Sequence, residues 1–299
     1  MSHFTCLAIG NLEEVMAPFN EQASEYFTKT EENHESYIQD YYDIMNGTKK
    51  EAHDAFFDEY PESDRTIGTF IKWWADYMPC YNDEQIKNCT EKKQEYAVIK
   101  DSTLTGMYYF SNPNAKYDYY QEASARWDCD VILKDGSHVS EGRVGDIDID
   151  AMVERVRKNR AESYDKVCKH IKTPINHTPF KTFQLAYQNK EITREEALDK
   201  YNNQPVVKKF RVYGQKSGWA NINPDDFLCT RDEYINNAAL PFFSINILGE
   251  WSERGSVGWW AIVTDEKNPA EWRDEVYNKL KDAIENHPDE TFTLIDCHI

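Results

Sequence analysis

The hydrophobic positions at the start of the chain form one short run followed by a long helical pattern. Residues 4–9, FTCLAI, are almost continuously apolar and end at a Gly-Asn turn, which predicts a short buried strand. Across residues 12–59 apolar side chains recur every three or four positions, and residues 47–50 interrupt the pattern. This spacing predicts two helices. A further amphipathic helix is predicted over residues 66–78 and is closed by Pro79.

The middle of the chain mixes strand, turn and helix signals. We expect extended structure to resume at residues 96–99. Residues 125–137 predict a strand that runs into an Asp135-Gly136 hairpin turn. A well-patterned helix follows, with Asp150 as its predicted N-cap.

The last part of the chain divides into a polar stretch and a strongly patterned one. Residues 175–235 are turn-rich, apart from a capping-box pattern at Thr193 and Glu196 that predicts a short helix. After them, the apolar runs PFFSINIL and GWWAIV, a helical pattern from Pro269 and the ending TFTLIDCHI predict strand, strand, helix and strand.

These patterns predict an α+β fold with a mixed or antiparallel sheet core and helical and extended insertions. Four segments are expected along the chain. They are an N-terminal strand plus an acidic aromatic helical segment (1–95), a central α+β region (96–174), an extended arm or linker (175–235), and a C-terminal β-β-α-β unit that packs on the core (236–299).

Negative charge is concentrated near the N-terminus. The chain has 299 residues and a formal net charge of -19, and residues 1–64 hold 15 Asp or Glu against three Lys. The same stretch is rich in Tyr and Phe. An acidic surface repels nucleic acid but attracts the basic surfaces of proteins that bind nucleic acid. The charge therefore predicts a protein partner and no direct contact with nucleic acid.

The candidate contact residues are acids and aromatic residues of this stretch, together with two pairs of adjacent tryptophans. Tyr and Trp supply much of the energy of protein interfaces, and an outward Trp beside acids suits a basic partner surface. Burial of both tryptophans of a pair under loops is equally compatible with the sequence. The candidates are Glu31, Glu32, Glu35, Tyr37, Asp40, Tyr41, Tyr42, Asp43, Trp73, Trp74, Trp259 and Trp260.

The sequence contains only weak candidates for metal-binding motifs. Asp146, Asp148 and Asp150 form a D-x-D-x-D motif that can chelate Mg²⁺ or Ca²⁺ on a curled loop, but no glycine occupies the sixth position. A solvated strand end with a helix cap is the favoured interpretation. Cys80 with Cys89, or Cys297 with His298, would supply only half of a zinc site. We therefore expect no metal and no cofactor, and free cysteines.

No sequence signature of catalysis stands out. The chain has no Walker A loop, dinucleotide fingerprint or H-E-x-x-H motif, and the G-S-V-G sequence at 255–258 lacks the strand-to-helix context of a nucleophile elbow. We expect a protein that is not an enzyme. No apolar run approaches the roughly 18 residues that cross a membrane, and MSHFTCLAIG lacks signal-peptide features, so an intracellular protein is expected.

Several segments resemble a family of bacteriophage-encoded proteins, and within that family the length and acidity of the chain resemble the inhibitors of the bacterial Gabija defence system. The segments are the opening SHFTCLAIGNLEEVMAPFNE, the central NPNAKYDYYQEASARW, the helix start DIDIDAM, and the ending GEWSERGSVGWWAIVTDEKNPAEWRDEV with TFTLIDCHI. The resemblance is loose and spans the whole chain. The central motif of the family contains Gly-Gly-Arg-Trp, of which Arg126 and Trp127 are present here.

This resemblance implies a non-enzymatic, homo-oligomeric inhibitor in the host cytoplasm. Its partner would be the Gabija complex of an ATPase-nuclease and a helicase subunit, which it would wrap around to block DNA binding and cleavage. The residues leave two other classes open. One is a metal-dependent phage enzyme that acts on a nucleotide or signalling molecule through Asp146, Asp148 and Asp150, and the other is an acidic DNA-mimic host-takeover protein.

Overall fold

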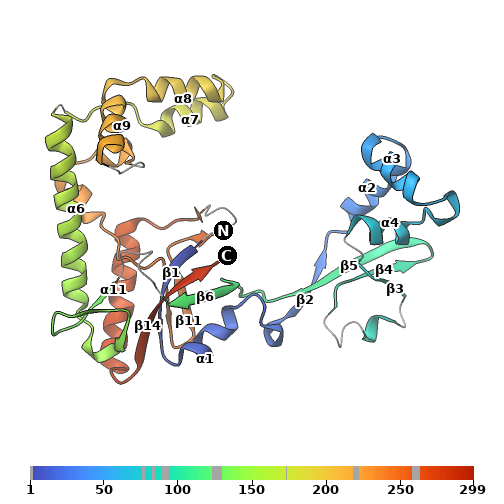
Figure 1. Cartoon of the computed structure of the whole chain (residues 1–299), viewed down its shortest axis with the longest axis horizontal. Helices are drawn as coiled ribbons and strands as arrows, with labels where there is room; N and C mark the ends of the chain where they lie inside the picture. Colours follow the sequence, from blue (N-terminus) through green and yellow to red (C-terminus); the bar gives the residue numbers. More distant parts are fainter. Residues whose placement is uncertain are drawn as a thin grey trace. The chain divides into compact units, whose positions relative to one another are not determined.

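The chain divides into two compact units. The computed structural model describes residues 3–75, 78–82, 85–88, 94–122, 130–172, 174–217, 222–257 and 263–299. Unit 1 comprises Met1–Val15 and Tyr120–Ile299, and unit 2 comprises Met16–Tyr119. Each unit combines helices with parallel and antiparallel strand pairs, which confirms the predicted α+β class (Figure 1). The division differs from the four segments expected from the sequence, because residues on both sides of position 95 belong to unit 2.

Unit 1 is built on a six-stranded sheet. Its first strand, β1 (His3–Ile9), is parallel to β10 (Ser244–Ile247) on one side and antiparallel to β14 (Thr291–His298) on the other. This central position explains the apolar run of β1, since a strand between two neighbours is buried on both faces. The remaining strands of the sheet are β11 (Glu250–Glu253), β6 (Tyr119–Glu122) and β9 (Glu141–Arg143).

Two long helices pack with this sheet around the main core of unit 1. They are α6 (Ile149–Ile171) and α11 (Pro269–Asn286). Trp272 of α11 is fully buried, and its indole N–H donates to the Phe242 carbonyl at 2.8 Å. The largest side chain of this core therefore keeps its one polar group satisfied. Three of the four elements expected at the end of the chain are present, as β10, α11 and β14. The second expected strand, GWWAIV, lies outside the described residues except for Val263. The strand β11 and the short pair β12 (Ser256–Val257) and β13 (Val263–Thr264) lie between β10 and α11.

The N-cap of α6 lies two residues before the predicted one. The N-cap is Asp148, whose carboxylate accepts the Ala151 N–H at 2.9 Å, and not Asp150. Asp150 lies in the first turn and accepts the Tyr277 hydroxyl. The predicted Asp-Gly turn is present between β7 (Val131–Ile132) and β8 (His138–Val139), with Gly136 at a φ of 82°. Residues 125–129 of the expected strand lie outside the described part of the chain.

The stretch 175–235, expected as an extended arm or linker, is helical. Its buried side chains pack on the second half of α6 through Val167 and Ile171, in a cluster that includes Phe210 and Phe227. Two of the helices begin with a capping box, one at Thr193 and one at Thr230. The helices are α7 (Phe180–Gln188), α8 (Arg194–Asn202), α9 (Pro205–Ser217) and α10 (Arg231–Asn236).

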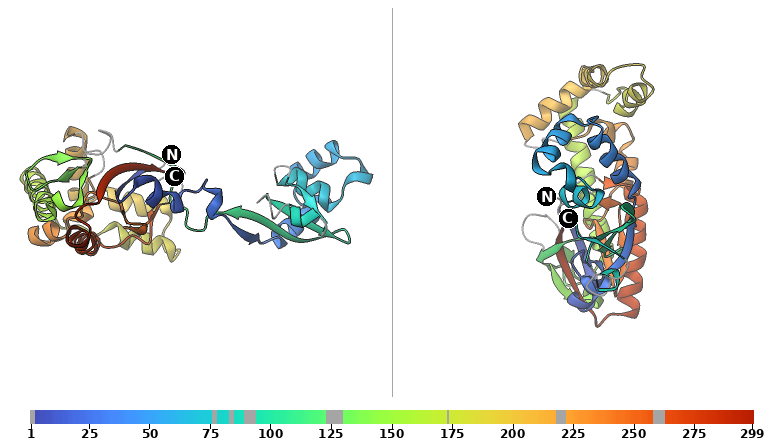
Figure 2. Two further views of the ribbon diagram at one scale, coloured as in Figure 1. Left: turned by 90° about the horizontal axis from the view of Figure 1, so that it is seen from below. Right: turned by 90° about the vertical axis from the view of Figure 1, so that its right-hand side faces the viewer.

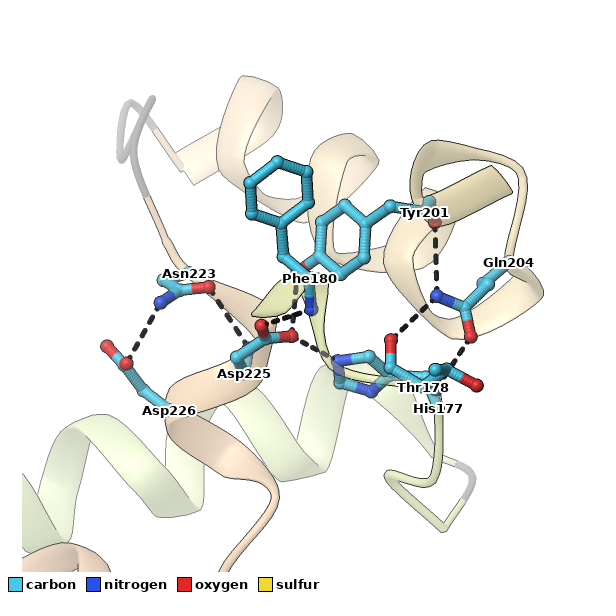
Figure 3. A network of polar contacts seen from close by, with 8 residues as sticks. All are labelled: His177, Thr178, Phe180, Tyr201, Gln204, Asn223, Asp225 and Asp226. Atoms are coloured by element: carbon cyan, nitrogen blue, oxygen red, sulfur yellow. Dashed lines mark hydrogen bonds and ion pairs between the residues drawn. The ribbon is translucent and has the colours of Figure 1, made fainter. Parts of the chain in front are cut away.

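A partly buried polar network also holds this helical stretch together (Figure 3). The carboxylate of Asp225 lies 2.8 Å from the His177 ring nitrogen Nε2, and it accepts the Tyr201 hydroxyl at 2.9 Å and the Phe180 N–H at 2.7 Å. Burial, followed by the hydrogen bond to Asp225, raises the pKa of Tyr201 well above its usual range. The network joins the segment before α7, the helix α8 and the turn at residue 225. The sequence prediction failed because these contacts join positions far apart in the chain.

Unit 2 has a four-stranded sheet with the order β2-β5-β4-β3. Three helices cover one of its faces, where Ile44, Phe56 and Phe70 pack against Ala97 and Met107 of the sheet (Figures 1 and 2). The strands are β2 (Thr28–Glu32), β3 (Cys80–Tyr81), β4 (Tyr96–Lys100) and β5 (Thr103–Ser111), and the helices are α2 (Glu35–Met45), α3 (Lys50–Glu59) and α4 (Ile67–Trp74).

The expected helical stretch 12–59 is therefore only partly helical. The predicted break at 47–50 falls between α2 and α3, whereas residues 28–32 form a strand because β5 supplies their backbone partners. The predicted helix at 66–78 is confirmed as α4, which ends at Trp74. The described residues also include the short α1 (Leu12–Met16), a helical turn at 85–88 and single turns of 3-10 helix at Ala17–Phe19, Ser24–Tyr26, Glu62–Asp64, Val144–Asp146 and Pro224–Phe227.

Candidate functional site

The candidate contact residues that the structure describes all lie in unit 2. Four aromatic rings of its helices form a continuous series, which we call the aromatic chain: Tyr42, Tyr41, Phe70 and Trp74. Successive ring centroids are 5.6, 5.5 and 5.8 Å apart. The other predicted pair, Trp259 and Trp260, lies outside the described residues.

The two ends of the aromatic chain are exposed and its middle is buried. Tyr42 is 55% exposed and Trp74 is 37% exposed, whereas Phe70 is completely buried. The Tyr41 hydroxyl donates to the Arg65 carbonyl at 3.1 Å, and burial, with a smaller contribution from Tyr42, raises the pKa of Tyr41. Two large exposed rings are thus held against a rigid core.

The first tryptophan pair takes one of the two arrangements that the sequence left open. Trp73 is half-buried and lies 5.0 Å from the ring of Phe56 in the core, while its neighbour Trp74 is exposed. Adjacent helical residues point in directions about 100° apart, so only one of the two can face the core directly. Trp74 is the member of the pair that can contact a partner.

The predicted acids do not form one surface. Glu31 and Glu32 are consecutive residues of β2 and so point to opposite faces of the sheet. Glu32 accepts the Tyr37 hydroxyl at 3.1 Å, and the pKa of Tyr37 is raised by burial and then by this carboxylate. Glu31 is exposed and lies 3.9 Å from the ring of His34. Glu32 and Tyr37 therefore contribute to the internal packing of unit 2.

The acids of α2 have different surroundings. Asp40 is ion-paired with Lys49 at 2.5 Å, and the same ammonium lies 5.6 Å from the centre of the Trp74 ring. Asp43 accepts a hydrogen bond from Gln39, and Glu35 is exposed in the first turn. Lys49 therefore offsets the charge of Asp40 beside the exposed tryptophan.

An acidic surface lies on α3, whose residues were not among the predicted contact residues. Glu51, Asp54 and Asp58 are exposed and are spaced at i, i+3 and i+7, so they share one side of the helix. The opposite side carries Phe56, which is fully buried. We call these three carboxylates the acidic face. The signal in the sequence was this spacing, which is stronger evidence of a common surface than charge density alone.

The D-x-D-x-D motif does not bring its carboxylates to one point. Asp148 caps α6 and Asp150 accepts the Tyr277 hydroxyl. Across the residues that the structure describes, no three His, Cys, Asp or Glu side chains are placed to hold a metal ion.

The cysteine pairs are also separated or buried. The Cys80 thiol donates to the Gly68 carbonyl, and burial raises its pKa, while Cys89 lies outside the described residues. Cys297 is buried in β14, and its neighbour His298 has its ring edge-on to His3, with the centroids 4.9 Å apart.

Comparisons of the chain with protein-family models, with curated proteins and with solved structures find no match. No described helix is both long enough and apolar enough to cross a membrane.

Proposed function

We propose that this chain is a phage anti-defence protein that inhibits a DNA-cleaving complex by stoichiometric binding. The observation that supports it best is the aromatic chain, which presents Tyr42 and Trp74 at its exposed ends and fixes them through the buried ring of Phe70. A ring that is already held in place loses little conformational entropy on binding. Large aromatic side chains are also the residues that most often dominate the energy of an interface.

The charge of the same region indicates the kind of partner. Residues 35–74, which span α2, α3 and α4, hold nine Asp and Glu against four Lys and Arg. A surface of this sign steers the protein toward basic surfaces, and a DNA-cleaving complex presents basic surface to its substrate. Covering that surface would exclude DNA without any chemistry by the inhibitor.

The sequence resemblance suggests that the partner is the Gabija complex of ATPase-nuclease and helicase subunits in the host cytoplasm. It also suggests that several copies of the chain bind together as a homo-oligomer. The first test uses purified Gabija complex and a DNA substrate, with the chain added in increasing amounts. We expect cleavage to stop near an equimolar ratio and the two proteins to co-elute on size exclusion. Full cleavage in the presence of excess chain, without co-elution, would overturn the proposal.

The second test locates the binding residues. Trp74→Ala and Tyr42→Ala should each weaken binding by about 30-fold or more, as expected for residues that dominate an interface. Tyr187→Ala is the matched control, because Tyr187 of α7 is 45% exposed and lies in unit 1. Equal affinities for all three variants would show that the aromatic chain is not the contact surface.

The same titration separates this proposal from an enzymatic one. A binding inhibitor reaches full effect only when the chain and the complex are present in similar amounts. If a small fraction of an equivalent abolished cleavage and a chelator reversed the effect, a metal-dependent enzyme would be the better account.

A further inference from the structure

Unit 1 contains a cavity that the proposed function does not use. Its volume is about 560 Å³, within the range of roughly 300–1,000 Å³ that is typical of small-molecule sites. One wall is a single face of α6, formed by Val156, Asn159, Arg160 and Ser163. The other walls are the start of β1, Tyr234 of α10, the segment 239–243 that leads into β10, and Arg254.

The charged side chains that line the cavity are all basic. Its lining includes His3, Arg160 and Arg254 and contains no Asp or Glu, although the chain has a formal net charge of -19. An anion in this cavity would therefore meet hydrogen-bond donors and no carboxylate among the lining residues.

His3 is oriented by a buried carboxylate. Its ring nitrogen Nδ1 lies 3.1 Å from Oδ2 of Asp296, which is completely buried and also accepts the side-chain amide of Gln121 at 3.2 Å. Because Nδ1 is turned to the carboxylate, Nε2 is the ring nitrogen that remains for the cavity.

Arg254 has a buried N–H group that lacks a hydrogen-bond acceptor among the described residues. Its Nη2 pairs with Glu266 at 2.6 Å, and its backbone N–H donates to the Phe243 carbonyl at 2.9 Å. Its Nε is buried and has no hydrogen-bond partner among the residues that the structure describes. A buried N–H without an acceptor destabilises a protein unless a ligand or water supplies one.

Arg160 is fixed on the opposite wall. Its Nε donates to the Tyr234 carbonyl at 3.2 Å, and its guanidinium carbon lies 3.7 Å from the centre of the Tyr234 ring. Asp226 is an electrostatic neighbour, and burial raises the pKa of that carboxyl. These contacts hold the guanidinium at the cavity before any ligand arrives, which is the arrangement expected of a preorganised anion site.

We propose that this cavity binds a small anionic ligand that also carries a flat ring, of the chemical class of nucleoside monophosphates. The anionic group would be bound by Arg160, Arg254 and His3. The ring would lie against the apolar part of the lining, which includes Pro241 and Phe243, with Asn159 and Ser163 able to hydrogen-bond its edge.

The test is isothermal titration calorimetry of the full chain with adenosine 5′-monophosphate, inorganic phosphate and adenosine. We expect the monophosphate to bind with a Kd below about 1 mM and each part alone to bind at least about tenfold more weakly. Absence of binding at that concentration would overturn the proposal, and so would adenosine binding as tightly as the monophosphate.

Variants then assign the site. Arg160→Met and Arg254→Met should each weaken binding by about tenfold to a hundredfold, the usual effect of losing a charged hydrogen bond. Arg231→Met is the matched control, because Arg231 is 46% exposed, pairs with Asp165 and does not line the cavity. Arg254→Lys keeps the positive charge and removes the Nε donor, so it serves if the Met variant does not fold. Unchanged affinity in Arg160→Met and Arg254→Lys would place the ligand elsewhere.

Discussion

The two units of the chain use the same residue types in opposite ways. In unit 1 the arginines Arg160 and Arg254 line a cavity that has no Asp or Glu in its lining, and the half-buried carboxylate of Asp225 ties helical segments together. In unit 2 the carboxylates of the acidic face are exposed and the buried ring of Phe70 supports exposed ones. The net charge of the chain therefore does not predict the charge of an individual binding site. What matters is which charges a unit buries and which it leaves on its surface.

The largest expected effect tests whether the two units are separate. Trp272→Ala removes a fully buried ring of unit 1 and its hydrogen bond to Phe242, and should destabilise that unit by about 3–5 kcal/mol. Amide hydrogen exchange should then rise in α11 and β14 and remain unchanged in α2 to α4. Equal loss of protection in both units would show that they unfold together and that the comparison is misleading.

A smaller effect is expected within unit 1 from the network around Asp225. Asp225→Asn removes the charge that holds His177 and Tyr201, and should cost about 1–3 kcal/mol. The measurement is the urea midpoint of unit 1, with Asp199→Asn on the exposed side of α8 as the control. If the two variants have the same midpoint, the network does not hold the helical stretch.

The acidic face gives the next prediction, which concerns unit 2. Neutralising Glu51, Asp54 and Asp58 together should slow association with the partner by about tenfold at low salt, and by much less at 1 M salt, where screening shortens the reach of charge. The control neutralises three exposed acids of unit 1, Glu162, Glu195 and Asp199. An equal slowing in both variants would mean that net charge, and not the acidic face, steers binding.

The smallest effect is a pH dependence in unit 1. Burial alone would raise the pKa of Asp130, but hydrogen bonds from Arg155 and His138 outweigh it and hold the pKa below the usual 3.8. As the pH falls, Asp130 is protonated in the unfolded chain at a higher pH than in the folded chain. The stabilisation by ionised Asp130 is therefore fully present above about pH 4 and is lost as the pH falls through the pKa of the folded state. Asp130→Asn should lose less stability than the wild type between pH 5 and pH 2, measured by urea unfolding. Identical pH profiles would contradict this assignment.

Local features of the fold could be predicted from the sequence. Gly136 at the hairpin turn, the capping box of Thr193 and Glu196, and the amphipathic stripe of α4 each depend on neighbouring residues, and the structure contains all three. The Asp148 cap was missed by two residues, because alternate aspartates offer equivalent caps to a pattern.

The features that failed depend on distant partners. The strand β2 is polar and gains its structure from β5, about 75 residues further along the chain, and the helices of 175–235 are held by Asp225 and α6. The cavity likewise joins β1, α6 and the residues before β10. Trp74 was predicted as a contact residue from the sequence. Its stacking on the buried ring of Phe70 depends on the three-dimensional structure and could not be predicted from the pattern alone.

The most direct test of the proposed function is hydrogen exchange of the chain mixed with the purified Gabija complex, its proposed partner. The account predicts that binding protects the amides of α2, α3 and α4 in unit 2, and that Trp74→Ala removes this protection. Protection confined to unit 1, with unit 2 exchanging as in the free chain, would contradict it.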